Sequence, residues 1–138
     1  MILPELKIVL QCCKGKTAVG EAIIMLKQEI SDSLHNPKYN IIVDFREFQV
    51  STENIDTDSI ILMVGFLKKL RITSKVAMLT SEPHQVIIAE SLKRQCDEIH
   101  ALTFETFSTL EAAISWVNSM NNYELIDRKL FELSQNTN

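Results

Sequence analysis

Glycine is scarce in this chain, and its scarcity excludes the glycine-rich loops that bind nucleotide phosphates. Three glycines, Gly15, Gly20 and Gly65, are spread over 138 residues, whereas a phosphate-binding loop needs its glycines close together. No G-x-S-x-G turn is present to expose a serine nucleophile. We therefore expect a protein that is not an enzyme.

Positive charge and long apolar runs are also lacking. The chain has 14 Lys and Arg against 18 Asp and Glu, with a net charge of -4. Because proteins that bind nucleic acid neutralise its phosphates with basic side chains, we expect no nucleic-acid partner. The longest apolar run, 60–67, is far shorter than the roughly 18 residues of a membrane span. With no secretory signal visible, we expect a cytoplasmic protein without an integral membrane segment, and peripheral membrane contact stays open.

Cysteine and histidine are too few and too scattered for a metal site. The chain has three of each, without a C-x-x-C motif or the Cys/His spacing of a zinc site. Cys12 and Cys13 are neighbours on an expected strand, so their side chains point to opposite faces and are poorly placed to bridge. We interpret the cysteines as small core residues of a reduced protein, and expect no metal and no cofactor.

What the chain does have is an alternation of strand-like and helix-like segments. Short apolar, β-branched runs predict strands at 6–13, 39–45, 75–80 and 99–104. Between them, apolar residues at three- and four-residue steps predict helices from Thr17 to the Asn36-Pro37 break, over 55–70 and over 83–96. Strands separated by single helices favour parallel pairing. We therefore expect an α/β fold.

The stretch FETFSTLEAAISWV at 104–117 predicts the end of a strand and the start of a helix. Ser108 and Glu111 match the S-x-x-E capping box, in which each side chain satisfies a backbone donor at the helix start. Trp116 is expected to pack at the edge of the core rather than to stack on a ligand.

The last part of the chain carries a narrow apolar seam. Its members fall at steps of three, four and three residues: Tyr123, Ile126, Leu130 and Leu133. The seam either folds back on its own domain or pairs with the same helix of a second copy, and we favour a homodimer. The chain is thus divided into an α/β domain over 1–119 and an amphipathic C-terminal helix over 120–138.

Four features, taken in order, resemble the SpoIIAA-like family of bacterial STAS/SEC14-type domains. They are the turn KGKT at 14–17, VDFR at 43–46, KVA at 75–77 and F-x-T-L-E-A-A-I-x-W at 107–116. The resemblance covers 6–117. It implies a four- or five-stranded, mixed, mostly parallel sheet covered by helices, and a regulatory or ligand-binding role without catalysis.

The resemblance also implies a regulatory surface. In the related anti-sigma-factor antagonists, a serine at the helix start after the second of these motifs accepts phosphate. Ser51 and Thr52 occupy that region here, but the D-S-S-G or D-S-x-G signature is missing. A phosphate there would be stabilised by the helix N-terminus, whereas the alternative is that these residues only cap the helix.

The second hypothesis is a carrier or sensor with a groove for a small apolar ligand or lipid, which the SEC14-type relationship also suggests. The helix expected over 55–70 is apolar nearly all round and contains Gly65, which costs about 1 kcal/mol relative to alanine in a helix. Close packing or a ligand would explain this glycine, and Met63 and Phe66 would then line the groove. The alternative is a helix that packs in the core and contacts a second subunit.

Polar residues at the carboxyl ends of the expected strands carry the third hypothesis, a small hydrolase-type enzyme. Ser81, His84 and a carboxylate could act as nucleophile, base and orienter at this edge, where ligands bind in α/β sheets. Asp44 and Arg46 share a strand face and are expected to form an ion pair. We favour a non-catalytic module that binds a protein partner over the apolar-ligand carrier, and both over the enzyme.

Overall fold

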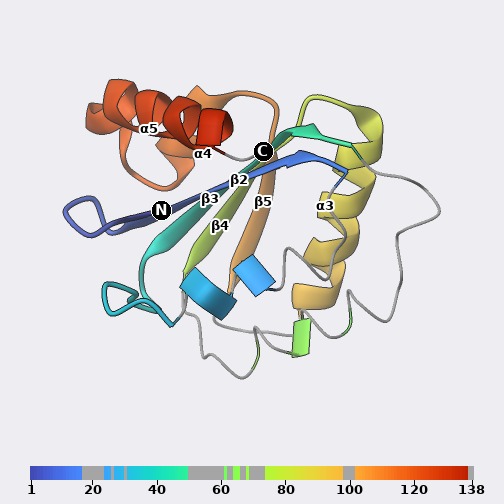
Figure 1. The fold of residues 1–138 in the computed structure, drawn as a ribbon. Helices are drawn as coiled ribbons and strands as arrows, with labels where there is room; N and C mark the ends of the chain where they lie inside the picture. Colours follow the sequence, from blue (N-terminus) through green and yellow to red (C-terminus); the bar gives the residue numbers. More distant parts are fainter. Residues whose placement is uncertain are drawn as a thin grey trace.

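The protein is described here by a computed structural model, which covers residues 1–16, 24–25, 27–29, 31–49, 61, 64–65, 68, 74–97 and 102–136. Its centre is one five-stranded sheet in the order β1-β2-β3-β4-β5 (Figure 1). The strands are β1 (Ile2–Leu3), β2 (Ile8–Gly15), β3 (Asn40–Phe48), β4 (Lys75–Leu79) and β5 (Thr103–Phe107). β1 pairs antiparallel with β2, and the other neighbours are parallel.

The α/β class and the mixed, mostly parallel sheet are therefore confirmed. Many α/β proteins share this architecture, so it does not by itself distinguish a STAS domain from them. The helices are α3 (Pro83–Cys96), α4 (Leu110–Trp116) and α5 (Tyr123–Asn136), with a 3-10 turn, η2 (Met120–Asn122), before α5. No helix of the described ranges is both long and apolar enough to cross a membrane.

Alternating side chains of the sheet build two cores, one on each face. In Figure 1, α3 covers one face, whereas α4 and α5 cover the other. The core under α3 includes Val9, Val43, Val76, Met78, Ile88, Ala89 and Leu92. The core under α4 and α5 includes Ile8, Leu10, Ile42, Leu79, Ile114, Ile126 and Leu130. Because both faces are covered, the strands read as nearly continuous apolar runs.

The seam of the C-terminal helix packs on the sheet of its own chain. Ile126 is fully buried and Leu130 is 3% exposed, while Tyr123 and Leu133 pack partly buried against the same core. The Lys14 ammonium on β2 also donates a hydrogen bond to the Ser134 carbonyl of α5, at 3.1 Å. The sequence leaves open whether this helix packs on its own domain or on a second copy, and the structure shows it packed on its own domain.

The helix expected to run to Asn36-Pro37 ends earlier, because residues 31–39 form turns. The Ser31 hydroxyl donates to the Lys27 carbonyl at 2.8 Å, and the Asp32 carboxylate accepts from the Leu34 amide at 2.8 Å. Such local side-chain bonds compete with helical hydrogen bonds.

The strand predicted at 99–104 is observed as β5, which begins at Thr103 and continues to Phe107. The Thr80 amide donates to the Phe107 carbonyl at 3.0 Å, so sheet pairing continues to that residue. The next helix begins correspondingly late, with Thr109 rather than Ser108 as its cap. The Thr109 hydroxyl accepts from the Ala112 amide at 3.3 Å.

Trp116 lies at the edge of the core, as predicted. Its ring packs against Phe107, with ring centres 5.6 Å apart. The Lys75 ammonium lies 5.0 Å from the ring centre and donates to the Trp116 carbonyl at 2.8 Å. A cation at this position also offsets the negative end of the α4 dipole. Lys75 on β4 thus fixes the last residue of α4 to the sheet.

Candidate functional site

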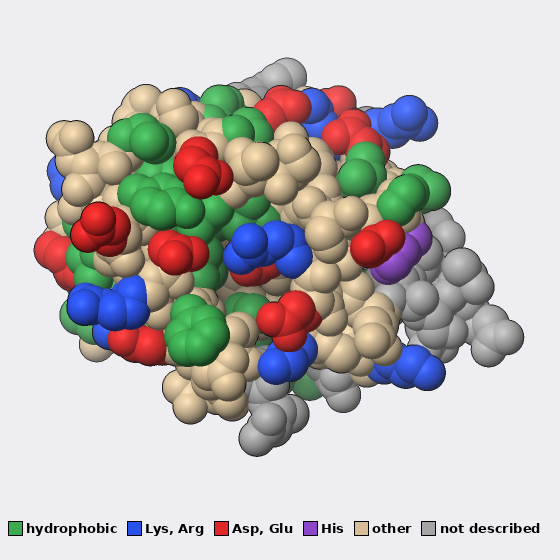
Figure 2. Space-filling model, turned by 90° about the horizontal axis from the view of Figure 1, so that it is seen from above, with side chains coloured by type: hydrophobic (Ala, Val, Ile, Leu, Met, Phe, Trp, Pro, Cys, Tyr) green, Lys and Arg blue, Asp and Glu red, His purple; other side chains and the backbone are tan. Residues whose placement is uncertain are grey.

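The carboxyl ends of β2 and β3 border a cavity of about 330 Å³ that α5 closes on one side. In α/β sheets this edge is where ligands bind. Figure 2 views the molecule from above and shows basic and acidic side chains side by side on this face, with hydrophobic side chains between them. The residues lining the cavity are Cys12, Asp44, Arg46, Glu47, Asp127, Leu130, Phe131 and Ser134.

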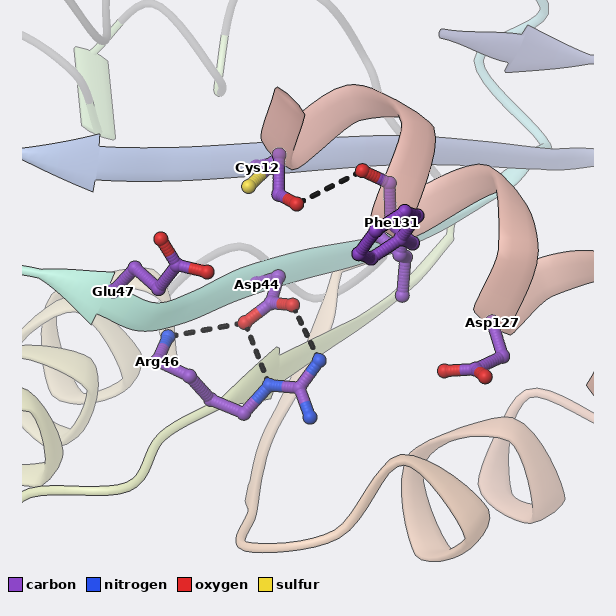
Figure 3. Close-up of a pocket in the computed structure, with 8 residues that line it drawn as sticks. Cys12, Asp44, Arg46, Glu47, Asp127 and Phe131 are labelled. Atoms are coloured by element: carbon purple, nitrogen blue, oxygen red, sulfur yellow. Dashed lines mark hydrogen bonds and ion pairs between the residues drawn. The ribbon is translucent and has the colours of Figure 1, made fainter. Parts of the chain in front are cut away.

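Asp44 and Arg46 form the predicted ion pair on the cavity floor (Figure 3). Asp44 Oδ1 accepts from the backbone amide and Nε of Arg46 at 3.0 and 2.9 Å, and Oδ2 accepts from Nη2 at 2.6 Å. Asp44 is only 8% exposed. The side-chain hydrogen bonds to Asp44 raise the pKa of Arg46 above its ordinary value. A paired, hydrogen-bonded carboxylate of this kind orders the end of β3.

A second pair ties the two strand ends together. The Lys14 ammonium on β2 lies 3.3 Å from the Glu47 carboxylate on β3. The pairing of β2 with β3 is irregular between Cys12 and Lys14, as in a β-bulge that re-aims side chains at a strand end.

Asp127 faces the Asp44–Arg46 pair from α5, across the cavity. In Figure 3 its carboxylate points towards the Arg46 guanidinium, and its charge contributes to the raised pKa of Arg46. No described residue forms a hydrogen bond or an ion pair with this carboxylate. Among the described residues of the cavity, Asp127 is thus a carboxylate without a hydrogen bond or a close ion pair, and it interacts with Arg46 only from across the cavity.

Phe131 forms the apolar rim of the same cavity. Its side chain is 64% exposed although Leu130, its neighbour in the chain, is buried. Phe131 follows Asp127 by four residues on α5, so the ring and the carboxylate lie on one helix face. The cavity thus joins a charged floor to an aromatic wall.

A second hollow, of about 290 Å³, lies beside the cavity at the start of α3. It is lined by Arg46, Glu47, Phe48, Gln49, Glu82, His84 and Gln85. Arg46 and Glu47 also line the cavity described above, so the two spaces adjoin. We call the cavity and this hollow together the strand-end groove.

Gln85 is a buried polar residue that joins the start of α3 to the end of β3. It is 2% exposed. Its Oε1 accepts from the amides of Ser81 and Glu82 at 2.7 and 3.0 Å. Its Nε2 donates to the carbonyls of Arg46 and Phe48 at 3.2 and 3.0 Å. One side chain thereby satisfies four backbone groups of two segments.

The apolar spacing predicts a helix over 83–96 but does not single out Gln85. A signal was present, because Gln at the third helical position after the cap is the second half of a capping box. Gln85 also bonds Arg46 and Phe48, which lie almost 40 residues away in the chain. These hydrogen bonds cannot be predicted from the sequence around Gln85.

Ser81 and His84 lie at the same edge as Asp44 and Arg46 but are not hydrogen-bonded to each other. The Ser81 hydroxyl donates to the Arg46 carbonyl at 3.1 Å, and His84 is exposed in the hollow. No hydrogen bond joins these two described residues. The nucleophile–base contact that the enzyme hypothesis needs is not formed here.

The three thiols are poor nucleophiles. Burial is the main cause of the raised thiol pKa values, which reach about 12 for Cys13 and about 11 for Cys96. For Cys12, burial and then the nearby Asp44 charge raise the pKa. Within the described part of the chain, no group of three His, Cys, Asp or Glu residues is arranged to hold a metal ion.

Native alkylation of these thiols is therefore expected to be slow. A pKa of about 11 instead of 9.0 lowers the thiolate fraction of Cys96 at pH 8 by about a hundredfold. Iodoacetamide labelling followed by intact-mass measurement should thus be at least that much slower than for the same protein in guanidinium chloride. A thiol that reacts at the same rate in both states would show that it is exposed and ionised.

The other predicted site residues are only partly covered by the structure. Ser51, Thr52, Met63 and Phe66 lie outside the described residues. Gly65 is described, is helical and is half-buried. A Cβ atom built on it meets no atom of the described residues within 4 Å, so packing against the described part of the chain does not explain this glycine.

Gly65→Ala is accordingly expected to stabilise the protein by about 0.5–1 kcal/mol, because alanine lowers the entropy cost of forming the helix. Gly15→Ala is the matched control: a Cβ atom there also meets nothing, but Gly15 has φ +66°. Alanine is disfavoured in that conformation by roughly 1–2 kcal/mol. Urea unfolding of both variants measures the difference, and a destabilised Gly65→Ala would reveal a contact made by the glycine itself.

Comparison with known proteins adds no identification, since no protein-family model, curated protein or solved structure matches this chain.

Proposed function

We propose that the protein is a non-catalytic, STAS-like regulatory or interaction module that binds a partner protein at the strand-end groove. The observation that carries the proposal is Phe131, a large aromatic side chain that is 64% exposed at the rim of a cavity. Aromatic residues in such positions are the usual energetic centres of protein interfaces.

The polar groups of the groove support binding rather than reaction. Asp44 and Arg46 are paired with each other, and Glu47 is paired with Lys14. The Ser81 hydroxyl is engaged by a backbone carbonyl. The side chains of Arg46, Glu47 and Lys14 stay 40, 55 and 36% exposed, so these pairs form a polar, solvent-accessible surround for the exposed ring, as at the rim of an interface.

Native mass spectrometry of the protein purified from its own host tests this proposal. The wild type is expected to retain a protein partner, and Phe131→Ala to retain at least tenfold less of it. Ile87→Ala is the matched control, because Ile87 is 65% exposed and lies on α3 outside the lining of the groove. Equal retention by all three proteins, or a wild type without any partner, would contradict the proposal.

Transport of a small apolar ligand is the second candidate, favoured by a separate cavity. A space of about 260 Å³ lies between β1, β2 and α5, and its apolar lining includes Ile2, Leu10, Met25 and Leu133. Gly65 of the groove expected at Met63, Gly65 and Phe66 is not among the described residues that line this space. Organic extraction of the host-purified protein should release a bound apolar molecule under this hypothesis, and a protein that is repeatedly empty speaks against it.

Phosphorylation and dimerisation stay predictions. Modification of Ser51 or Thr52 would add the mass of one phosphate in the same native spectrum. The homodimer would have to use another surface than the seam of α5, because Ile126 and Leu130 are buried within the chain. Light scattering at several protein concentrations measures this directly.

A further inference from the structure

Among the described residues that line the strand-end groove, carboxylates outnumber basic side chains. Its lining includes four carboxylates, on Asp44, Glu47, Glu82 and Asp127, and one guanidinium, on Arg46. Arg46 and Lys14 pair with Asp44 and Glu47. Among the described residues, Glu82 and Asp127 form no ion pair, although the Asp127 charge acts on Arg46 from across the cavity.

Asp127 and Phe131 together offer what a basic side chain needs. The carboxylate provides an ion pair, and the exposed ring provides a face on which a guanidinium or ammonium group is attracted. Long basic side chains also have an apolar stem, which packs against aromatic surface while the charge stays at a polar group. The cavity volume of about 330 Å³ is within the range of ligand pockets.

We propose that the groove recognises a basic segment of a protein partner, with one Arg or Lys side chain seated between Asp127 and Phe131. This inference rests on the proposed function and adds the chemistry of the partner. The net negative charge of the open groove, rather than its apolar rim alone, selects the occupant. A second basic residue of the segment would lie near Glu82, at the other end of the groove.

A peptide titration followed by amide NMR spectra tests the inference. The probes are acetylated, amidated hexapeptides of alternating Gly and Arg or of alternating Gly and Glu, at equal ionic strength. The arginine peptide is expected to shift the resonances of Asp127, Phe131 and Arg46, and the glutamate peptide to leave them unchanged. Equal effects of both peptides, or shifts confined to another surface, would overturn the inference.

Two charge reversals separate recognition from general attraction. Asp127→Lys should weaken binding of the arginine peptide at least tenfold. Glu5→Lys changes the net charge equally, but exposed Glu5 lies before the amino end of β2, at the opposite edge of the sheet, and should stay within twofold of wild type. If both variants weakened binding of the arginine peptide equally, the attraction would depend on net charge and not on this site. The spectra also show that each variant is folded.

The two proposals fail differently. If the native partner complex depends on Phe131 but survives Asp127→Lys, the basic-segment inference is wrong and the proposed function stands. If the complex does not depend on Phe131, the proposed function is wrong whatever the peptides do.

Discussion

Replacing Ile126 by alanine is expected to lower the free energy of unfolding by about 2–5 kcal/mol, the usual range for truncating a buried isoleucine to alanine. Ile126 is fully buried between α5 and the sheet, so its loss leaves a cavity that the packed neighbours cannot fill. Chemical denaturation monitored by circular dichroism measures the change. Ile87→Ala, on the exposed side of α3, should change the free energy by about 0.5 kcal/mol or less.

The same reasoning extends to the whole helix. Deleting residues 121–138 uncovers apolar side chains of β2, including Leu10, and is expected to leave a chain that does not fold cooperatively. If α5 instead served mainly to join two copies, the truncated protein would be a folded monomer. An Ile126→Ala effect that depends on protein concentration would point to the same alternative.

Replacing Gln85 by leucine is expected to destabilise the protein by about 3 kcal/mol or more. The change removes the Gln85 hydrogen bonds of the Ser81 and Glu82 amides and of the Phe48 carbonyl, whereas the Arg46 carbonyl keeps the Ser81 hydroxyl. Each unsatisfied buried group costs about 1–3 kcal/mol. Leucine has a similar size, so lost packing contributes little. Exposed Gln135 is the control, and Gln135→Leu should have little effect. An equally small loss at Gln85 would show that water replaces its hydrogen bonds.

Gln85→Glu adds a dependence on pH. The introduced carboxylate still accepts from the Ser81 and Glu82 amides, but it faces the Arg46 and Phe48 carbonyls to which Gln85 donates. Burial and these carbonyls raise the pKa of the new carboxyl above its unfolded value. The folded state then binds the proton more tightly, so the deficit relative to wild type should be smallest at acid pH and grow as pH rises through that pKa. A deficit independent of pH would contradict this geometry.

Local chemistry explains which features were predictable from the sequence. The Asp44–Arg46 pair was expected because residues two apart on a strand share a face. Both residues lie in one short segment, so no distant part of the chain is needed to bring them together. The capping-box pattern predicts the cap of α4 one residue too early, at Ser108 instead of Thr109, because both residues carry a hydroxyl. The choice between them depends on how far β5 pairs with β4, which is not a local property.

The groove could not be predicted in the same way. Asp127 and Phe131 fall outside the apolar seam of the last helix, and the sequence pattern singles out neither of them. Each becomes significant because α5 lies beside the ends of β2 and β3, which are at least 75 residues away in the chain. Gln85 was missed for the same reason, since its partners lie on β3.

The sequence by itself determined the α/β class, the alternation of strands and helices and the apolar seam of the last helix, because periodicity and turn residues act over a few neighbours. Only the tertiary structure decided which surface that seam covers and which charges remain unpaired at the strand ends. The hydrophobic effect is non-directional, so an apolar seam is satisfied equally by its own sheet or by a second chain. Because the seam packs on its own sheet, α5 brings Asp127 and Phe131 to the groove.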